Sequence, residues 1–303
     1  MSSSMGYASA EYARTCAHLG VPRTLPRSGV TVLVRAVEVP LAAADACGAY
    51  PLLRTMRWCD LAADLAAETE LLSFVAVVDP LATPAPGTLD LVFPDHLIAF
   101  KTHAIAHLDA RAPLAHVQAD HRRKARRAAR TVEIEVAPDP RSLAAPWLRL
   151  YGALRAKHGF AGAPDFSATA LAAQLDLPGM LAVTARAGAD VVSMSLWFVD
   201  GDTAHYHLGA SDARGYAAHA SYATFAHAFE VLAGRGVEWV GLGGAAGDSD
   251  RDDGLARFKR GWATGERTAW LGGRILDRER YALLSGGREA RPYFPSYRAR
   301  VAA

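Results

Sequence analysis

Hydrophobic residues recur along this chain at two different spacings, which predict strands and helices in turn. Residues 30–39 are β-branched and partly alternating, as in a strand. Residues 143–158 carry aromatic and aliphatic side chains three and four positions apart, as on a helix with one face in a core. The same patterns predict further strands at 73–79, 89–93, 97–100, 132–136, 180–187, 190–199, 203–208 and 237–242, a short strand near Ala269, and further helices at 62–72, 113–130, 217–235 and 277–284.

These elements divide the chain into two predicted domains, residues 1–112 and residues 113–303. The second domain contains, in order, a helix, a strand, a helix, a strand, a hairpin, a long helix and a strand. The first domain holds a shorter, strand-rich version, so a duplicated core is expected although no sequence repeat is visible. The expected fold class is therefore α/β (α+β), with tandem domains whose mixed central sheets are flanked by helices.

The composition is that of a globular protein. Of the 303 residues, 51% are hydrophobic and 21% are charged, and the formal net charge is +2. This balance excludes a strongly basic nucleic-acid-coating protein but not a local basic patch. The three cysteines have no metal-like spacing, as is ordinary in a reducing compartment. The first twenty residues lack a signal-peptide pattern and no stretch approaches a membrane span, so we expect a cytoplasmic protein without membrane insertion.

The most informative segment is residues 241–262, GLGGAAGDSDRDDGLARFKRGW, which begins as the predicted strand 237–242 ends. Its glycines allow backbone amides to approach an anionic ligand. A lysine placed as Lys259 is can hold a phosphate or stabilise a developing oxyanion. The alternative is a surface lysine in a basic cluster with Arg257 and Arg260.

Residues 113–298 carry a series of short motifs in a defined order. They are the basic helix before Val132, YHLGAS at 206–211, ASYA at 220–223, LGG at 242–244, GLARFKRG at 254–261 and YFPSYR at 293–298, preceded by KTH at 101–103. With these motifs the chain resembles the FemABX-like branch of the GNAT acyltransferase superfamily. The resemblance covers most of residues 113–303 and little of the N-terminal third.

The resemblance implies a tandem GNAT fold and transfer of an amino acid from aminoacyl-tRNA to an amine. In peptidoglycan-branching members the acceptor is a muropeptide precursor, and in antibiotic pathways relatives act on small molecules or peptide intermediates. The family's Phe-Lys pair matches Phe258 and Lys259, and its lysine is thought to hold the tRNA terminus and stabilise charge. Phe258 could stack on the terminal adenine, although an aromatic beside a helix or strand is more often part of a core.

The donor of an ordinary GNAT enzyme is coenzyme A, whose pyrophosphate binds a loop of small residues before the long helix. Here the corresponding stretch is RGYAAHA at 214–220, where Tyr216 and His219 add bulk. This favours a different donor; the alternative is a plain loop-to-helix junction with a solvated Arg214. No cofactor is predicted beyond aminoacyl-tRNA as co-substrate. The donor-binding candidates are Gly243, Gly244, Arg214, Arg257 and Arg260.

The acceptor and proton-transfer residues are less sharply marked. The strand at 191–198 lacks the glutamate that many acetyltransferases use as general base, which fits an activated ester donor. Asp212 or His207 could relay the amine proton. The acceptor-binding candidates are Tyr206, His207, Tyr216, Tyr222 and Lys101, the last with His103 beside it; each alone is as compatible with packing as with binding.

Two runs of charged residues have competing interpretations. Residues 121–130 hold six Arg or Lys on a predicted helix, which could follow a tRNA backbone through phosphate contacts or form a solvated face. Residues 248–253 contain four aspartates (Asp248, Asp250, Asp252 and Asp253), which resemble a calcium loop in composition. The glutamate twelve positions from the first ligand is missing, so no metal is predicted.

Three functions remain open from the sequence. The leading hypothesis is an aminoacyl-tRNA-dependent aminoacyltransferase that forms an amide on a small-molecule or peptide amine, in natural-product biosynthesis or, alternatively, on a peptidoglycan precursor. A second is an N-acyltransferase that uses acyl-CoA or an acyl carrier protein. A third is a non-catalytic tRNA- or peptide-binding protein on a decayed GNAT fold.

Overall fold

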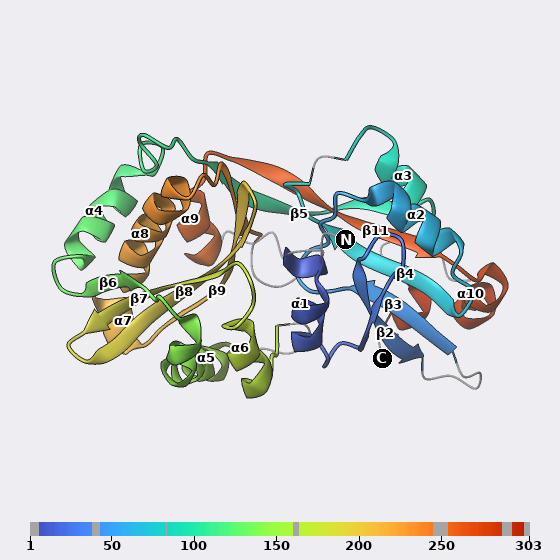
Figure 1. Cartoon of the computed structure of the whole chain (residues 1–303), viewed down its shortest axis with the longest axis horizontal. Coiled ribbons are helices and arrows are strands. Elements are labelled where there is room, and N and C mark those ends of the chain that lie inside the picture. The colour runs from blue at the N-terminus through green and yellow to red at the C-terminus, as the bar shows by residue number, and fades with distance from the viewer. Residues whose placement is uncertain are drawn as a thin grey trace. The chain divides into compact units, whose positions relative to one another are not determined.

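The chain forms two compact units, residues 1–100 with 269–303 and residues 101–268. The computed structural model describes residues 6–37, 43–82, 84–159, 164–244, 254–286 and 293–299 (Figure 1). Each unit is built around its own section of mixed sheet.

The sheet of unit 1 has the strand order β1-β2-β3-β4-β11. Neighbours are antiparallel except β3 and β4, which are parallel and joined through helix α2 (Trp58–Ala66). The strands are β1 (Val21–Thr24), β2 (Thr31–Val37), β3 (Ala43–Gly48), β4 (Leu71–Val78) and the second half of β11 (Gly265–Ile275). The other helices are α1 (Ala10–Thr15), α3 (Thr88–Val92) and α10 (Arg278–Ser285), with 3-10 turns at Gly6–Ala8 and Ser296–Arg298.

The sheet of unit 2 has the order β5-β10-β9-β8-β7-β6. Only the pair β9–β10 is parallel. The strands are the second half of β5 (His96–His107), β6 (Glu133–Val136), β7 (Met180–Ala187), β8 (Asp190–Asp200), β9 (Thr203–Ser211) and β10 (Trp239–Gly243). Helices α4 (Ala119–Ala128), α8 (Ala220–Gly234) and α9 (Gly254–Arg260) lie on one face, and α5 (Ala144–His158) and α6 (Ala168–Gln174) on the other (Figure 1). Short elements complete the unit: α7 (Ala213–Ala217) and a 3-10 turn at Pro140–Leu143.

The two units repeat one topology, which confirms the predicted tandem mixed sheets flanked by helices. In each, an antiparallel meander is followed by a helical crossover, a strand parallel to the last one, and then an antiparallel neighbour. The two units exchange this antiparallel neighbour, because β5 begins in unit 1 and β11 begins in unit 2. Ala104–His107 of β5 pairs with β10 in unit 2, whereas Trp270–Ile275 of β11 pairs with β4 in unit 1.

This exchange makes the units differ from the expected ranges 1–112 and 113–303. Residues 101–112 belong to unit 2 and residues 269–303 to unit 1. Residues 101–107, which lie in the expected first domain, continue β5. Hydrophobic periodicity reports which face a residue buries but not which strand it pairs with, so the exchange left no local signal.

Several predicted elements were wrong in type or bounds. Residues 89–93 form helix α3 rather than a strand, because five apolar-rich residues are too few to separate the two periods. The helix expected at 62–72 is α2, which ends at Ala66 before β4 begins at Leu71. Residues 254–260, for which no helix was predicted, form helix α9.

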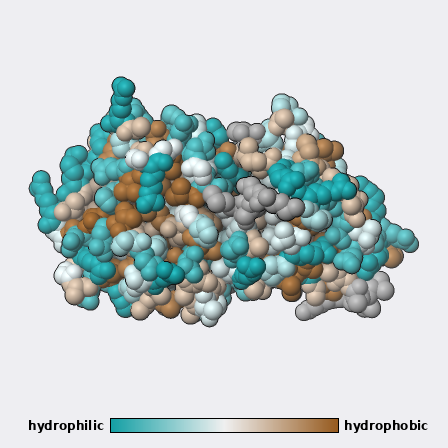
Figure 2. Space-filling view, in the orientation of Figure 1, coloured by the Kyte–Doolittle hydropathy of each residue, from teal (hydrophilic) through white to brown (hydrophobic). Residues whose placement is uncertain are grey.

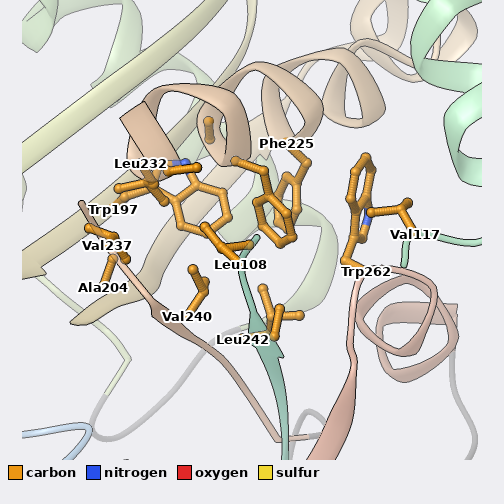
Figure 3. Packing of buried hydrophobic residues seen from close by; sticks show 14 of the residues in the cluster. Leu108, Val117, Trp197, Ala204, Phe225, Leu232, Val237, Val240, Leu242 and Trp262 are labelled. Carbon is orange, nitrogen blue, oxygen red and sulfur yellow. The ribbon is translucent and has the colours of Figure 1, made fainter. Parts of the chain in front are cut away.

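The core of unit 2 is aromatic and lies between α8 and the sheet (Figure 3). Trp197 on β8 meets Phe225 of α8 edge-to-face at 4.8 Å between ring centroids, and Phe229 at 6.0 Å. Trp262, which follows α9, packs against both phenyl rings at 5.5 Å. Such pairs add about 0.5–1.5 kcal/mol each beyond area burial, so they fix α8 and the end of α9 against one sheet face.

A buried carboxylate holds the C-terminal segment on unit 1. Asp45 of β3 is fully buried and accepts hydrogen bonds from Arg35 (2.8 Å), from Tyr297 (3.0 Å) and twice from Arg298 (2.5 and 3.0 Å). Tyr297 also shares a 2.8 Å hydrogen bond with Ser73 of β4. Two cations therefore depend on one buried anion.

We predict that Asp45→Asn lowers the free energy of unfolding of unit 1 by about 3 kcal/mol, because it leaves two partly buried guanidinium groups without their anion. Chemical denaturation measures the change. The matched control is Asp60→Asn, which removes an exposed ion pair with Arg57 and should cost less than about 0.5 kcal/mol. Equal losses in the two variants would contradict the prediction.

Candidate active site

The parallel strands β9 and β10 separate at their carboxyl ends. Their pairing covers only Thr203–His205 and Trp239–Gly241, although β9 continues to Ser211. On its other side β9 carries a bulge at His207, because Tyr206 pairs with Trp197 but Leu208 pairs with Leu196. Bulges re-aim side chains beside active sites, and ligands of open α/β sheets bind at the carboxyl ends of strands. We therefore place the candidate site at this divergence.

Lys259 lies at the end of β10. Its side chain is buried, with 8% exposure, and Nζ donates a 2.6 Å hydrogen bond to the carbonyl of Gly244. Gly243 has φ +80°, and a Cβ there would lie 3.1 Å from Lys259 Nζ. A Cβ on Gly244 would lie 3.1 Å from the ring of His103 on β5. The structure thus brings Lys259, both glycines and His103 together, with a cation held at a fixed point.

Phe258 is enclosed by other aromatic rings. Its ring centroid lies 4.7 Å from that of Phe225 and 5.0 Å from that of Tyr222, both in edge-to-face geometry. His121 and Trp262 lie at 5.8 and 6.1 Å. These contacts anchor α9 in the core, so the ring of Phe258 has a packing role here. Tyr222 is part of the same cluster, with Nζ of Lys124 5.0 Å from its ring centre.

Tyr206 also belongs to this aromatic core, with ring centroids 5.3 Å from Trp197 and 4.7 Å from Phe225. Burial raises the pKa of its hydroxyl well above the usual value, and the hydroxyls of Tyr216 and Tyr151 add to the shift. Tyr216, by contrast, is 47% exposed, with Lys157 Nζ 4.7 Å from its ring centre. Lys101 is half-buried on β5, two residues before His103.

His207 is a neutral imidazole. Burial lowers its pKa to about 3, and neighbouring His205 contributes. Its Nε2 lies 3.2 Å from Oε1 of Gln174, a fully buried residue of α6, so Nε2 carries the proton and donates. Phe166 and Phe198 flank the ring at 6.5 and 6.3 Å between centroids. Gln174 could not be found from the sequence, because a glutamine in an Ala-rich helix has no signature.

The residues at 214–220 form helix α7 and its junction with α8 rather than an open phosphate loop. Arg214 pairs with Asp190 at 3.0 Å and, more distantly, with Asp212 at 3.8 Å. Asp212 caps α7 by accepting from the amide of Gly215 at 2.9 Å. A Cβ on Gly215 would lie 2.2 Å from the carbonyl of Val192, so packing explains this glycine. Arg257 and Arg260 are exposed on α9.

Helix α4 presents one basic face to solvent. Its alanines Ala125 and Ala128 and the ring of His121 are buried, whereas Arg126 and Arg127 are exposed. Arg123 and Arg130 are exposed as well, and Asp120 binds Arg123 and Lys124 at 2.5 and 2.9 Å. Figure 2 shows hydrophilic side chains along this outer edge of the unit. We call the exposed set Arg123, Arg126, Arg127 and Arg130 the α4 basic face.

No cluster of three or more His, Cys, Asp or Glu suited to a metal occurs within the described ranges. Asp248, Asp250, Asp252 and Asp253 lie outside those ranges. Among the helices that the structure describes, none is long and apolar enough to cross a membrane.

Residues 115–260 match the family described as the acetyltransferase (GNAT) domain. The fold is similar to that of FemX, with a TM-score of 0.67, 15% identity, and 91% of this chain and 93% of that chain covered. It is also similar to the C-terminal domain of a protein named as a lysylphosphatidylglycerol synthetase from Agrobacterium fabrum (TM-score 0.59, 14% identity, 97% and 94% covered). A third similar structure is L-PGS from Bacillus licheniformis (0.55, 13%, 87% and 87%). None of the curated proteins matches the sequence.

The chain therefore carries a GNAT acyltransferase domain. Its fold is that of the FemABX-like branch of this superfamily, which confirms the resemblance read from the sequence.

We predict that His207 makes the stability of the protein depend on pH. Its pKa is about 3 when folded and 6.5 as the ordinary value, so between these pH values the unfolded state binds one more proton. The contribution of neutral His207 to the free energy of unfolding is therefore at its full value above pH 6.5. It falls as the pH drops toward 3, with a slope of up to about 1.4 kcal/mol per pH unit.

The measurement is the free energy of unfolding from pH 4 to 8 for the wild-type protein and for His207→Gln. The difference between the two proteins should be constant above pH 7 and should shrink below pH 6. A difference that is independent of pH would mean that His207 protonates normally in the folded protein.

Proposed function

We propose that this protein moves an amino acid from aminoacyl-tRNA to the amine of a small-molecule or peptide acceptor, forming an amide bond. The observation that carries the proposal is the buried Lys259 ammonium, held on the Gly244 carbonyl where β9 and β10 diverge. Two similar structures bear names that refer to lysylphosphatidylglycerol synthetase and L-PGS, and a third is FemX. These names, together with the FemABX-like resemblance, favour an aminoacyl donor over acetyl-coenzyme A.

In this reaction the acceptor nitrogen attacks the ester carbonyl of the donor. The N–C bond forms, the C–O bond to the terminal ribose breaks, and the amine proton passes to the departing ribose oxygen. Nζ of Lys259 donates a hydrogen bond to the Gly244 carbonyl, and its positive charge also acts on neighbouring groups through space. Lys259 can then stabilise the oxyanion or hold the donor's phosphate, and little reorganisation is needed because the charge is already held in a buried position.

Two features of unit 2 support aminoacyl-tRNA as the donor. The segment that holds pyrophosphate in coenzyme A enzymes is occupied here by helix α7, with Arg214 bound to Asp190 and Asp212. The α4 basic face offers four exposed guanidinium groups that suit a polyphosphate backbone. We propose the cytoplasm as the site of the reaction and natural-product biosynthesis as its setting, because charged tRNA is a cytoplasmic substrate and no long coiled-coil insertion occurs among the helices that the structure describes.

The proposal predicts that amide formation in an assay coupled to aminoacyl-tRNA synthetases stops when RNase is added. Lys259→Met should lower kcat by about 10²–10³-fold, the usual cost of a lost oxyanion donor, while the protein stays folded. Product is measured by mass spectrometry over a panel of amines. The charge control is Arg141→Met, an exposed residue paired with Asp139, which should keep full activity.

Activity that persists after RNase treatment would overturn the tRNA donor. If such activity requires acyl-CoA or an acyl carrier protein, the N-acyltransferase alternative replaces the proposal. Binding of tRNA without any amide product would leave only a binding protein.

We further predict that the triple variant Arg126→Gln, Arg127→Gln and Arg130→Gln weakens tRNA binding and lowers its salt dependence. Each lost phosphate contact reduces the slope of log K against log salt by about 0.7–0.9. The matched control is Arg141→Gln with Arg155→Gln, two exposed arginines outside α4. Binding isotherms at several salt concentrations decide the question, and equal slopes in both variants would exclude the α4 basic face as the tRNA contact.

A further inference from the structure

The carboxyl end of α9 is held by a short segment of chain that leads into α4. Nε2 of His121 lies 3.1 Å from the carbonyl oxygen of Phe258, and Nε2 of His116 lies 3.0 Å from that of Trp262. Between them, the backbone amide of Gln118 donates to the carbonyl of Gly261 at 3.0 Å. The last carbonyls of a helix have no partner within the helix, and His121 supplies a donor to that of Phe258 in the last turn of α9. His116 and Gln118 hold the two residues that directly follow the helix, Trp262 and Gly261. We call the three donors, from His116, Gln118 and His121, the α9 clamp.

The imidazole of His121 is fitted closely into its position. A Cβ on Gly261 would lie 2.1 Å from its Nε2, so only glycine leaves room for the ring. The ring contacts Tyr222 at 4.9 Å and Trp262 at 5.5 Å between centroids, both edge-to-face. Figure 3 shows Trp262 beside Val117, which lies between the two histidines in the chain. Hydrogen bonds and packing thus act on the same end of α9.

Both histidines are suited to act as neutral donors. Burial lowers the pKa of His116 and of His121. The groups that face His121 are Lys124, Asp120 and the backbone carbonyl of Phe258, and those that face His116 are His107, Arg122 and the carbonyl of Trp262. Because a carbonyl oxygen only accepts, each imidazole carries its proton on Nε2.

Lys259 lies inside the turn that the clamp holds. It directly follows Phe258, and its own carbonyl accepts from the amide of Trp262 at 3.0 Å. Helix α9 has seven residues, and so short a helix is marginal without tertiary contacts. The tertiary contacts that hold α9 therefore set the direction in which the Lys259 side chain leaves the helix.

We infer that His121, with His116, is a positioning residue that keeps the Lys259 ammonium on the Gly244 carbonyl and so in place for transfer. This inference rests on the proposed function, since it assigns to the clamp the placement of the same lysine. It also connects α4, whose outer face is basic, with the helix that carries Lys259.

The activity test is a double-mutant cycle in the aminoacyl-tRNA assay. His121→Leu should lower kcat about tenfold with little change in the donor's KM, because the partly buried Phe258 carbonyl loses its donor. His121→Gln keeps a side-chain N–H and should stay within about threefold of the wild-type protein. In a Lys259→Met background, His121→Leu should have less than a twofold further effect. An equal effect in both backgrounds would show a general loss of structure and overturn the inference.

A second test needs no substrate. Hydrogen exchange of the amides of Gly261 and Trp262 should be about tenfold faster in His121→Leu than in the wild-type protein, and unchanged in His227→Leu, which alters a half-buried histidine of α8. If His121→Leu does not fold, Gly261→Ala displaces the imidazole while retaining it and should give the same acceleration. Unchanged exchange in these variants would overturn the clamp. Absence of tRNA-dependent activity in the wild-type protein would overturn the proposed function alone, because the exchange result still decides the clamp.

Discussion

The parallel pairing of β9 with β10 is the constraint on which the rest of unit 2 depends. Parallel neighbours cannot be joined by a tight turn, so the chain must cross one face of the sheet, as α7 and α8 do. That crossover places Phe225 and Phe229 over the strands, where they form the aromatic core with Trp197 and Trp262. Because the pairing stops at His205 and Gly241, the strand ends are free to separate where Lys259 lies.

A buried ammonium is the second feature that shapes this region. Removing a charge from water is costly unless hydrogen bonds replace the lost hydration, and the Gly244 carbonyl supplies one of them. The lysine must then be aimed accurately from a helix of only seven residues. Phe258 and Trp262, which flank the lysine in the chain, supply that accuracy by packing into the core. The site thus depends on the core for its geometry and on the strand divergence for its location.

Much of the fold could be predicted where the local pattern was long. Residues 180–187 were predicted as a strand and form β7 with those bounds, and the hairpin β8–β9 follows from apolar-rich runs on both sides of its Asp-Gly turn. The prediction of a strand at 89–93 was wrong because the hydrophobic run there is too short to show a period. In the site, Lys259 and its two glycines could be found from their motif, whereas Gln174 and the clamp histidines could not, because their contacts join elements distant in the chain.

The amino-acid sequence alone is enough to predict the helices and strands with clear periodicity, the family resemblance, and the segment that contains Lys259. These properties depend on residues within a few positions of one another, so a local pattern is enough to reveal them. Three features follow instead from tertiary contacts: β5 and β11 exchange neighbours, Phe258 packs against the core, and His121 reaches the end of α9. Pairing and packing between distant segments depend on which surfaces fit together in space, and no single stretch of chain carries that information.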